Sequence, residues 1–320
     1  MTQPKLLMTR VLSPAVIERA RRDYDLDLNE SDHIMGADEL AARCQGKDAA
    51  LITLTERFTA EVIAKLPPSL RILATYSVGY DHIDLAAAKA RGIRVANTPD
   101  AVTVATAEIA MLLILGSARR APEGERLLKE KQWRGWQPMQ LIGRRLDGKR
   151  LGILGMGKIG QALAKRARAF DMEVHYYNRR RCSPAEEQGA IYHASFDSLL
   201  AVSDVLSINA PSTPETRGCL NAVALAKLPP GAIVVNTARG DLVNDDDLIA
   251  ALKSGQVSYA GLDVYKGEPD INPGYYELEN VFLLPHMGTS VIEARNEMGF
   301  AALDNIDAVL AGREPPFAVV

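Results

Sequence analysis

Short apolar runs alternate with amphipathic stretches along almost the whole chain, and this alternation limits the fold more than any other feature of the sequence. In the first third of the chain the apolar runs are Lys5–Thr9, Ala49–Thr53, Arg71–Thr75 and Ile93–Ala96. Farther along they are Arg150–Leu154, Glu173–Asn178, Val205–Ile208, Ala232–Asn236, Tyr259–Leu262 and Val281–Leu284. Because these runs are apolar throughout rather than at every second residue, they predict strands covered on both faces. We therefore expect an α/β fold in which helices wrap parallel sheets.

The two series of runs are separated by a long helical pattern, Val102 to Arg120, and by a loop that holds Trp133 and Trp136. A second helical pattern, Thr289 to Leu310, lies near the end of the chain. A chain of 320 residues is long enough for about two domains. We expect two doubly wound parallel-sheet domains, Rossmann- or flavodoxin-like, with a cleft between them. Residues 1–99 plus 288–320 would form one domain, and residues 100–287 the other.

The composition argues against several classes of protein. Lys and Arg number 37 against 40 Asp and Glu, so the chain lacks the basic excess of a dedicated nucleic-acid-binding protein. Its three cysteines, Cys44, Cys182 and Cys219, are too few and too far apart for a disulfide framework or a CxxC metal site. No apolar run approaches the ~20 residues of a membrane span, and the first residues lack a signal-peptide pattern. We expect a cytoplasmic protein with no metal site and no membrane or nucleic-acid partner.

A glycine-rich turn lies where one apolar run ends and a helical pattern begins. The sequence Gly155-Met156-Gly157-Lys158-Ile159-Gly160 directly follows Arg150–Leu154. In this GxGxxG pattern the first glycine permits a tight turn, the second lets the backbone approach a pyrophosphate, and the third allows the helix to pack closely on the strand. Free N–H groups and the helix dipole favour an anion there. We interpret residues 155–160 as a dinucleotide-binding loop, and the alternative is a purely structural turn.

The residues after the next expected strand bear on the choice of dinucleotide. NAD-binding proteins usually have an acidic residue about 20 positions after the glycines, whereas this chain has Asn178-Arg179-Arg180-Arg181. A carboxylate repels the 2′-phosphate of NADP, and a guanidinium pairs with it. We therefore expect NADP(H), bound by Asn178, Arg179 and Arg180, with NAD(H) as the weaker alternative. The other interpretation is that the arginines form a solvated surface run.

The histidines are few enough to be compared by position. His33 lies in a polar loop, and His82 comes before a helical pattern. His175 lies inside an expected strand, and His193 lies in a connecting segment. His286 instead follows the run Val281–Leu284, and ligands of α/β sheets bind at strand ends. Arg239 and Glu268 also follow expected strands. An imidazole, a guanidinium and a carboxylate at three strand ends, beside a dinucleotide loop, indicate proton-coupled hydride transfer on a carboxylate substrate.

Five segments occur in a characteristic order: Ser77–Asp84, the glycine loop, Asn236–Gly240, Gly261–Pro269 and Pro285–Gly288. Together they resemble the D-isomer-specific 2-hydroxyacid dehydrogenase family over nearly the whole chain. Ser77–His82 and Thr98-Pro99-Asp100 are most similar to the glyoxylate/hydroxypyruvate reductases of that family. The resemblance implies that residues 1–99 plus 288–320 form the substrate domain and that residues 100–287 form the dinucleotide-binding domain.

The resemblance also implies roles for individual residues. His286 would protonate the substrate carbonyl oxygen, Glu268 would hold its imidazole, and Arg239 would bind and orient the 2-oxo acid. The backbone amides of Val78 and Gly79 would bind the substrate carboxylate. Further implied contacts to the cofactor, besides residues 155–160 and 178–180, are Thr106, Asn209, Ala210, Pro211, Thr216, Thr237, Asp263 and Gly288.

These observations predict an NADPH-dependent enzyme that reduces glyoxylate or hydroxypyruvate to the D-2-hydroxy acid. Two alternatives remain: a phosphoglycerate-type or D-lactate-type dehydrogenase, and a non-catalytic dinucleotide-sensing protein of the same fold. The resemblance implies a homodimer. Trp133 and Trp136 either cover the neighbouring subunit's substrate pocket or anchor their loop in their own subunit. Leu54 either lines the substrate pocket or belongs to the core.

Overall fold

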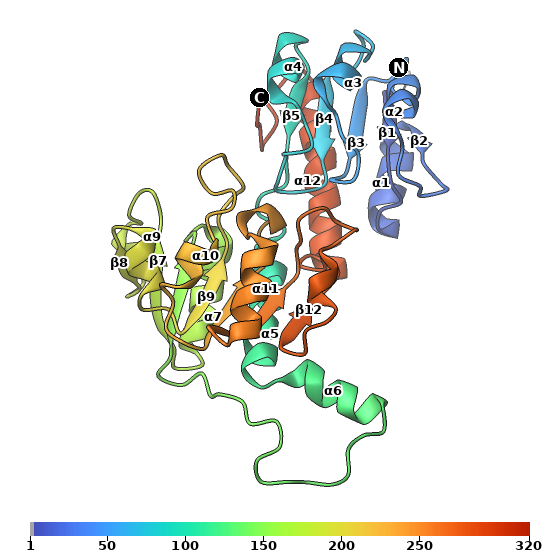
Figure 1. The fold of residues 1–320 in the computed structure, drawn as a ribbon. Coiled ribbons are helices and arrows are strands. Elements are labelled where there is room, and N and C mark those ends of the chain that lie inside the picture. Colours follow the sequence, from blue (N-terminus) through green and yellow to red (C-terminus); the bar gives the residue numbers. More distant parts are fainter. Residues whose placement is uncertain (1–2) are drawn as a thin grey trace. The chain divides into compact units, whose positions relative to one another are not determined.

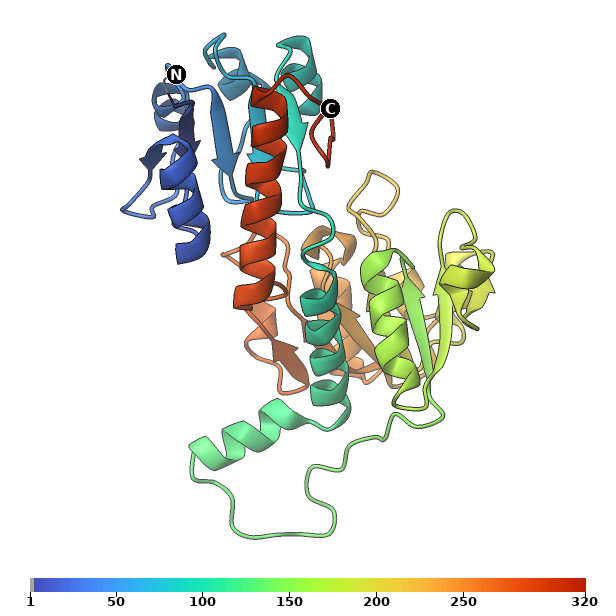
Figure 2. The same cartoon turned by 180° about the vertical axis from the view of Figure 1, so that it is seen from behind.

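The computed structural model describes residues 3–320, and the chain divides into two compact units. The first unit comprises Met1–Val102 and Thr289–Val320, and the second comprises Thr103–Gly288. The chain thus passes between units at residues 102/103 and 288/289, whereas the sequence placed the joints at 99/100 and 287/288. Figures 1 and 2 show the elements of both units from opposite sides.

The first unit is built on a five-stranded parallel sheet with strand order β2-β1-β3-β4-β5. The strands are β1 (Lys5–Met8), β2 (Asp25–Leu28), β3 (Ala49–Ile52), β4 (Ile72–Thr75) and β5 (Arg94–Ala96). Its helices are α1 (Pro14–Asp23), α2 (Ala37–Arg43), α3 (Ala60–Ala64), α4 (Leu85–Ala90) and α12 (Ile292–Leu310). Side chains of α2, α3 and α4 form one hydrophobic core with the sheet. Helix α12 packs against β3, β4 and β5 (Figure 2), so the central strands are buried on both faces.

The second unit contains a seven-stranded parallel sheet with order β12-β11-β10-β9-β6-β7-β8. The strands are β6 (Arg150–Leu154), β7 (Glu173–Tyr177), β8 (Ile191–His193), β9 (Val205–Ile208), β10 (Ala232–Asn236), β11 (Val257–Leu262) and β12 (Val281–Leu283). The helices are α5 (Thr103–Ala118), α6 (Ala121–Lys129), α7 (Lys158–Arg168), α8 (Pro184–Glu187), α9 (Phe196–Leu200), α10 (Ala222–Leu225) and α11 (Asp245–Ser254), with short 3-10 turns at Gly240–Leu242 and Pro273–Tyr275. Helices α5 and α7 line one core cluster and α9, α10 and α11 line another. The sheet is therefore covered on both faces, as the continuous apolar runs predict.

The strand register of this second sheet decides where functional residues lie. Leu154, the last residue of β6, is paired with Tyr177 of β7 and with Ile208 of β9. Asn236 at the end of β10 is paired with Ile208 and with Leu262 of β11. These five strands consequently end level with one another, and the residues that follow them share one edge of the sheet.

Two strands lie outside the sequence prediction, and both are sheet edges. Strand β2 alternates polar and apolar residues, and β8 is exposed at Ile191, so neither has the continuous apolar pattern of a strand buried on both faces. The assignment of His193 to a connecting segment was therefore wrong, because it belongs to β8. His82 comes before α4, but the residue that caps this helix is Asp84. His82 is buried, with its Nε2 3.1 Å from Thr75 Oγ1.

None of the helices between residues 3 and 320 has the length and apolar character needed to cross a membrane.

Candidate active site

His286 and Glu268 form a hydrogen-bonded pair in the second unit. His286 follows β12, and its Nδ1 lies 2.7 Å from Glu268 Oε2. The other carboxylate oxygen of Glu268 accepts the backbone N–H of Tyr265 at 2.6 Å. Burial by itself would raise the pKa of Glu268, but the hydrogen bond and charge of His286, with help from Tyr265 and Arg239, lower it below its usual value. Glu268 is therefore a carboxylate at neutral pH, and a carboxylate at Nδ1 stabilises a protonated imidazole.

Arg239 comes from the neighbouring strand end, and its charge contributes to the low pKa of Glu268. The side-chain amide of Asn236 shapes the turn after β10, accepting the N–H of Ala238 at 3.0 Å and donating to the carbonyl of Arg239 at 2.8 Å. The next residue, Gly240, packs against the segment that leads to Glu268: a Cβ there would lie 1.9 Å from the carbonyl carbon of Tyr265. Glycine therefore allows the two loops to approach each other.

Asp263 is placed where β11 ends. It is 1% exposed, and its Oδ1 accepts the backbone N–H of Met287 at 2.7 Å. Burial is the main reason that its pKa is raised. Gly288 lies so close that a Cβ on it would be 3.1 Å from Asp263 Oδ2 and 3.5 Å from Thr106 Oγ1. Thr106, Asp263 and Gly288, three of the residues assigned to the cofactor, therefore lie together.

The glycine loop has the conformation that its sequence predicts. Gly155 has φ +98°, and a Cβ there would be 2.6 Å from the backbone nitrogen of Ala210. A Cβ on Gly160 would be 2.4 Å from the carbonyl oxygen of Gly155. A Cβ on Gly157 would meet nothing within 4 Å, so this side of the loop faces open space at the start of α7. Such an N-terminus, with its first N–H groups unused by the helix, is suited to a pyrophosphate.

Two buried polar atoms along the same edge lack a partner among the described residues. They are Asn209 Oδ1, after β9, and Thr237 Oγ1, after β10. An unpaired buried polar atom costs about 1–3 kcal/mol, and a bound dinucleotide would supply the missing hydrogen bonds. Thr216 differs, because its hydroxyl donates to the carbonyl of Pro211 at 2.7 Å and accepts the N–H of Thr213 at 2.8 Å. Its side chain shapes the loop.

The run after β7 is not a uniform set of arginines. Asn178 Oδ1 accepts the backbone N–H of Met156 in the glycine loop at 2.7 Å. Arg179 and Arg180 are exposed. The pKa of Glu215 is lowered mainly by a hydrogen bond from Thr213, and the charge of Arg179 contributes to the same shift. Arg181 forms an ion pair with Glu187 of its own unit.

Val78 and Gly79 belong to the first unit, after β4. The Ser77 hydroxyl donates to the carbonyl of Gly79 at 2.6 Å, and Asn97 Nδ2 donates to the carbonyl of Val78 at 2.8 Å. Within residues 3–320 neither N–H of Val78 and Gly79 meets an acceptor. The carbonyls of this turn are thus occupied while two adjacent N–H groups remain available for an anion.

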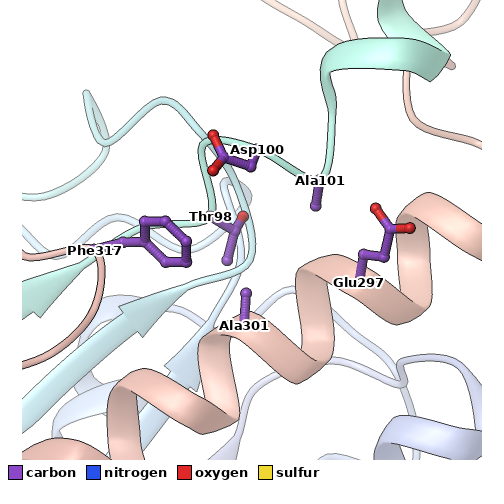
Figure 3. A pocket seen from close by; sticks show the side chains of 6 residues that line it. All are labelled: Thr98, Asp100, Ala101, Glu297, Ala301 and Phe317. Atoms are coloured by element: carbon purple, nitrogen blue, oxygen red, sulfur yellow. The ribbon is translucent and has the colours of Figure 1, made fainter.

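A cavity of about 210 Å³ in the first unit contains none of the predicted site residues (Figure 3). It is lined by Thr98, Asp100, Ala101, Glu297, Ala301 and Phe317. Among residues 3–320, no group of three or more His, Cys, Asp or Glu side chains is arranged to hold a metal ion. Leu54 is 43% exposed, so it is not an ordinary core residue.

Sequence reasoning missed the contacts that orient the predicted residues. The hydroxyl of Tyr265 donates to the carbonyls of Leu262 and Leu284 and so joins the ends of β11 and β12, while its N–H holds Glu268. The only signal in the sequence was the spacing Tyr265–Glu268, which suits a turn and names no partner. The N–H of Met287 that binds Asp263 leaves no trace in the side-chain sequence.

The fold and this edge of the sheet define a class: a two-unit, parallel-sheet α/β protein with a glycine-rich dinucleotide loop. Comparison with known proteins gives the family. Residues 111–288 match the model described as "D-isomer specific 2-hydroxyacid dehydrogenase, NAD binding domain". The chain is 51% identical over 321 residues to a glycerate dehydrogenase of Hyphomicrobium methylovorum, with all of both chains covered.

Two crystal structures extend the comparison. One, from Polaromonas sp., assigned to the NAD-binding D-isomer specific 2-hydroxyacid dehydrogenases, has a TM-score of 0.95 and 47% identity, covering 99% of this chain and 100% of that one. The other is an NADPH-dependent glyoxylate/hydroxypyruvate reductase of Sinorhizobium meliloti with NADP and malonate, with a TM-score of 0.89 and 30% identity, covering 100% and 97%. This chain belongs to the D-isomer specific 2-hydroxyacid dehydrogenase family. It is an oxidoreductase that uses a nicotinamide dinucleotide and acts on 2-hydroxy or 2-oxo acids.

Proposed function

We propose that this protein uses NADPH to reduce a small 2-oxo acid, glyoxylate or hydroxypyruvate, to the D-2-hydroxy acid, with His286 as the proton donor. The observation that carries the proposal is the His286–Glu268 pair, with Arg239 on the adjacent strand end. Because Nδ1 of His286 is engaged by Glu268, Nε2 is the atom that delivers the proton. The D configuration follows from the family.

The other residues divide the work of holding the substrate. Arg239 would bind the 2-oxo acid and stabilise the negative charge that develops on its carbonyl oxygen. The N–H groups of Val78 and Gly79 would take the substrate carboxylate, since both lack an acceptor among the described residues. The first unit would thus be the substrate domain and the second the dinucleotide-binding domain.

The cofactor supplies the hydride when it is bound. Residues 155–160 would hold its pyrophosphate at the start of α7, and Thr106, Asp263 and Gly288 would lie beside its nicotinamide. Asn209 to Pro211 and Thr237 would complete the site, with Thr216 holding the loop after Pro211 in shape. Asn178, Arg179 and Arg180 would recognise the 2′-phosphate; the absence of a carboxylate at position 178 and the exposure of both guanidinium groups support NADP(H) over NAD(H). The Sinorhizobium meliloti reductase with bound NADP is consistent with that choice.

We expect the protein to act in the cytoplasm as a homodimer. The segment that follows α6 runs away from the sheet of the second unit (Figures 1 and 2). The end of α6 and this segment expose Leu128, Trp136, Met139 and Ile142, at 61%, 80%, 79% and 55%. Several large apolar side chains exposed in one segment favour an interface. At 80% exposure Trp136 does not anchor the loop within its own chain, which leaves coverage of the neighbouring subunit as its proposed role; Trp133 is half exposed. Light scattering should give twice the chain mass of 34.8 kDa, and Trp136→Ala should weaken the dimer.

Initial rates with glyoxylate, hydroxypyruvate, pyruvate and larger 2-oxo acids, each with NADPH and with NADH, test the proposal. We expect the highest kcat/KM for the two small substrates with NADPH. A preference for pyruvate or a phosphorylated acid would instead indicate a D-lactate-type or phosphoglycerate-type dehydrogenase. Tight NADPH binding without oxidation of any substrate would indicate a dinucleotide-sensing protein. His286→Asn should lower kcat by about 10²-fold or more while cofactor affinity stays unchanged, and equal losses in both would refute the assigned role.

A further inference from the structure

Arg181, whose side chain is 64% exposed, is bound by the buried carboxylate of Glu187. Its Nε lies 2.7 Å from Glu187 Oε1 and its Nη2 lies 3.1 Å from Glu187 Oε2. The hydroxyl of Tyr176 on β7 donates to the same carboxylate. The guanidinium also lies over the ring of Tyr192, 5.7 Å from its centroid. We call Tyr176, Arg181 and Glu187 the Arg181 clamp.

Burial makes the clamp durable. Tyr176 is 0% exposed and Glu187 is 7% exposed. A buried carboxylate that loses its cation is strongly destabilised, so Glu187 keeps Arg181 as its partner. Arg168 on α7 donates to the backbone carbonyl of Glu187 at 2.8 Å and fixes the end of α8. Two nitrogens of the Arg181 guanidinium are therefore engaged by the fold, although the side chain itself is 64% exposed.

The same hydroxyl fixes the loop between β7 and α8. Tyr176 accepts the backbone N–H of Cys182 at 3.0 Å, on the far side of the arginine run. On the near side, Asn178 is bound to the glycine loop through its side chain. Between these two fixed points lie three exposed arginines, of which Arg181 is paired with Glu187 whereas Arg179 and Arg180 form no such pair among the described residues.

We propose that Tyr176 and Glu187 are positioning residues for 2′-phosphate recognition. They withdraw Arg181 from the phosphate site and fix the loop so that Arg179 and Arg180 are presented at the end of β7 before a ligand binds. The inference rests on the proposed preference for NADP(H). Preorganised charged groups lose less entropy when they bind an anion, so loosening this loop weakens phosphate binding selectively.

Calorimetric titration with 2′,5′-ADP and with 5′-AMP tests the clamp without catalysis, because the two ligands differ only in the 2′-phosphate. Tyr176→Phe keeps every charge and removes the hydroxyl that joins Glu187 to Cys182. We expect the affinity for 2′,5′-ADP to fall about tenfold, comparable to the loss of one hydrogen bond to a charged group, and that for 5′-AMP to change by less than about twofold. Tyr192→Phe is the matched control, since it retains the ring beneath Arg181.

Glu187→Gln gives a second, opposite-signed test. If the local charge alone mattered, removing an anion and releasing Arg181 would tighten the binding of 2′,5′-ADP. Loss of positioning would instead weaken that binding. Tighter binding, no change in either variant, or equal losses for both nucleotides would overturn the proposal. If Arg179→Ala and Arg180→Ala abolish the discrimination but Tyr176→Phe and Glu187→Gln do not, only the clamp is wrong. If the wild type does not discriminate, the proposed NADP(H) preference itself is wrong and the clamp proposal is overturned with it.

Discussion

Replacing Glu268 with Gln isolates the charge of the carboxylate from its shape, because the glutamine oxygen still accepts the Nδ1–H of His286. Two unit charges about 4 Å apart attract by about 4 kcal/mol at an effective dielectric constant near 20. The side chains of His286 and Glu268 are 33% and 29% exposed, so solvent screens the pair. We therefore expect the charge of Glu268 to contribute about 1.5–2 kcal/mol to stabilisation of the transition state, well below the unscreened value. Because about 1.4 kcal/mol equals a factor of ten in rate, Glu268→Gln should lower kcat/KM by about 10–30-fold.

The assay is kcat/KM for 2-oxo acid reduction from about pH 5 to about pH 9, the range in which histidine titrates. Glu268→Gln keeps the hydrogen bond to Nδ1 and removes the charge, so kcat/KM should lie below the wild-type value across this range. Because the pKa of Glu268 is lowered, its own titration lies below this window. Glu277→Gln, at an exposed position, is the control. A Glu268→Gln rate equal to the wild-type rate would refute electrostatic stabilisation and leave Glu268 only an orienting role.

Three further predictions follow from the contacts of the second unit. Arg239→Lys keeps the charge but loses the planar fork, so kcat should drop about 10–100-fold with unchanged NADPH affinity by calorimetry; a parallel loss of affinity would contradict this role. Gly240→Ala places a Cβ 1.9 Å from the Tyr265 carbonyl carbon, so activity and Tm should both fall, and a wild-type Tm would refute the contact. The hydrogen bond from Arg150 is the main cause of the lowered pKa of Asp204. That stabilisation exists above the unfolded pKa near 3.9 and is lost as pH falls through the folded pKa. Urea unfolding should therefore find Asp204→Asn about 1 kcal/mol less stable than the wild type at pH 7, and this difference should close in acid. A difference that does not depend on pH would exclude the ion pair.

The sequence predicted the interior strands because each is buried on both faces and is therefore apolar throughout. The edge strands β2 and β8 do not obey that constraint, since one side of an edge strand has no neighbour and its residues tolerate solvent. His193 was misassigned for this reason. His33 shows a related limit: its acidic partner is Glu39, six residues away, with Nε2 2.9 Å from Oε1, and nothing in the sequence pairs these two residues.

Within the site, the rule that strand ends converge predicts Arg239, Glu268 and His286 from the sequence alone. The rule works because parallel register places these ends at one edge, and it needs no knowledge of side-chain contacts. The contacts that give each residue its chemistry are nonlocal and mostly involve backbone. The N–H of Tyr265 on Glu268 and the N–H of Met287 on Asp263 are examples. Every residue has a backbone N–H, so no residue type identifies these donors in advance.

The arginine run shows most clearly what tertiary structure adds. In sequence, Arg179, Arg180 and Arg181 are equivalent charges, and both a phosphate site and a solvated surface run fit the pattern. Glu187 breaks the equivalence, because its buried carboxylate requires one cation and Arg181 meets it in two hydrogen bonds. One member of the run is therefore paired with a carboxylate of the fold, and its two neighbours, which have no such pair among the described residues, are the groups that we propose for a ligand. Which arginine serves the fold is set by the position of Glu187 on α8, six residues beyond Arg181, and the charge pattern alone does not encode it.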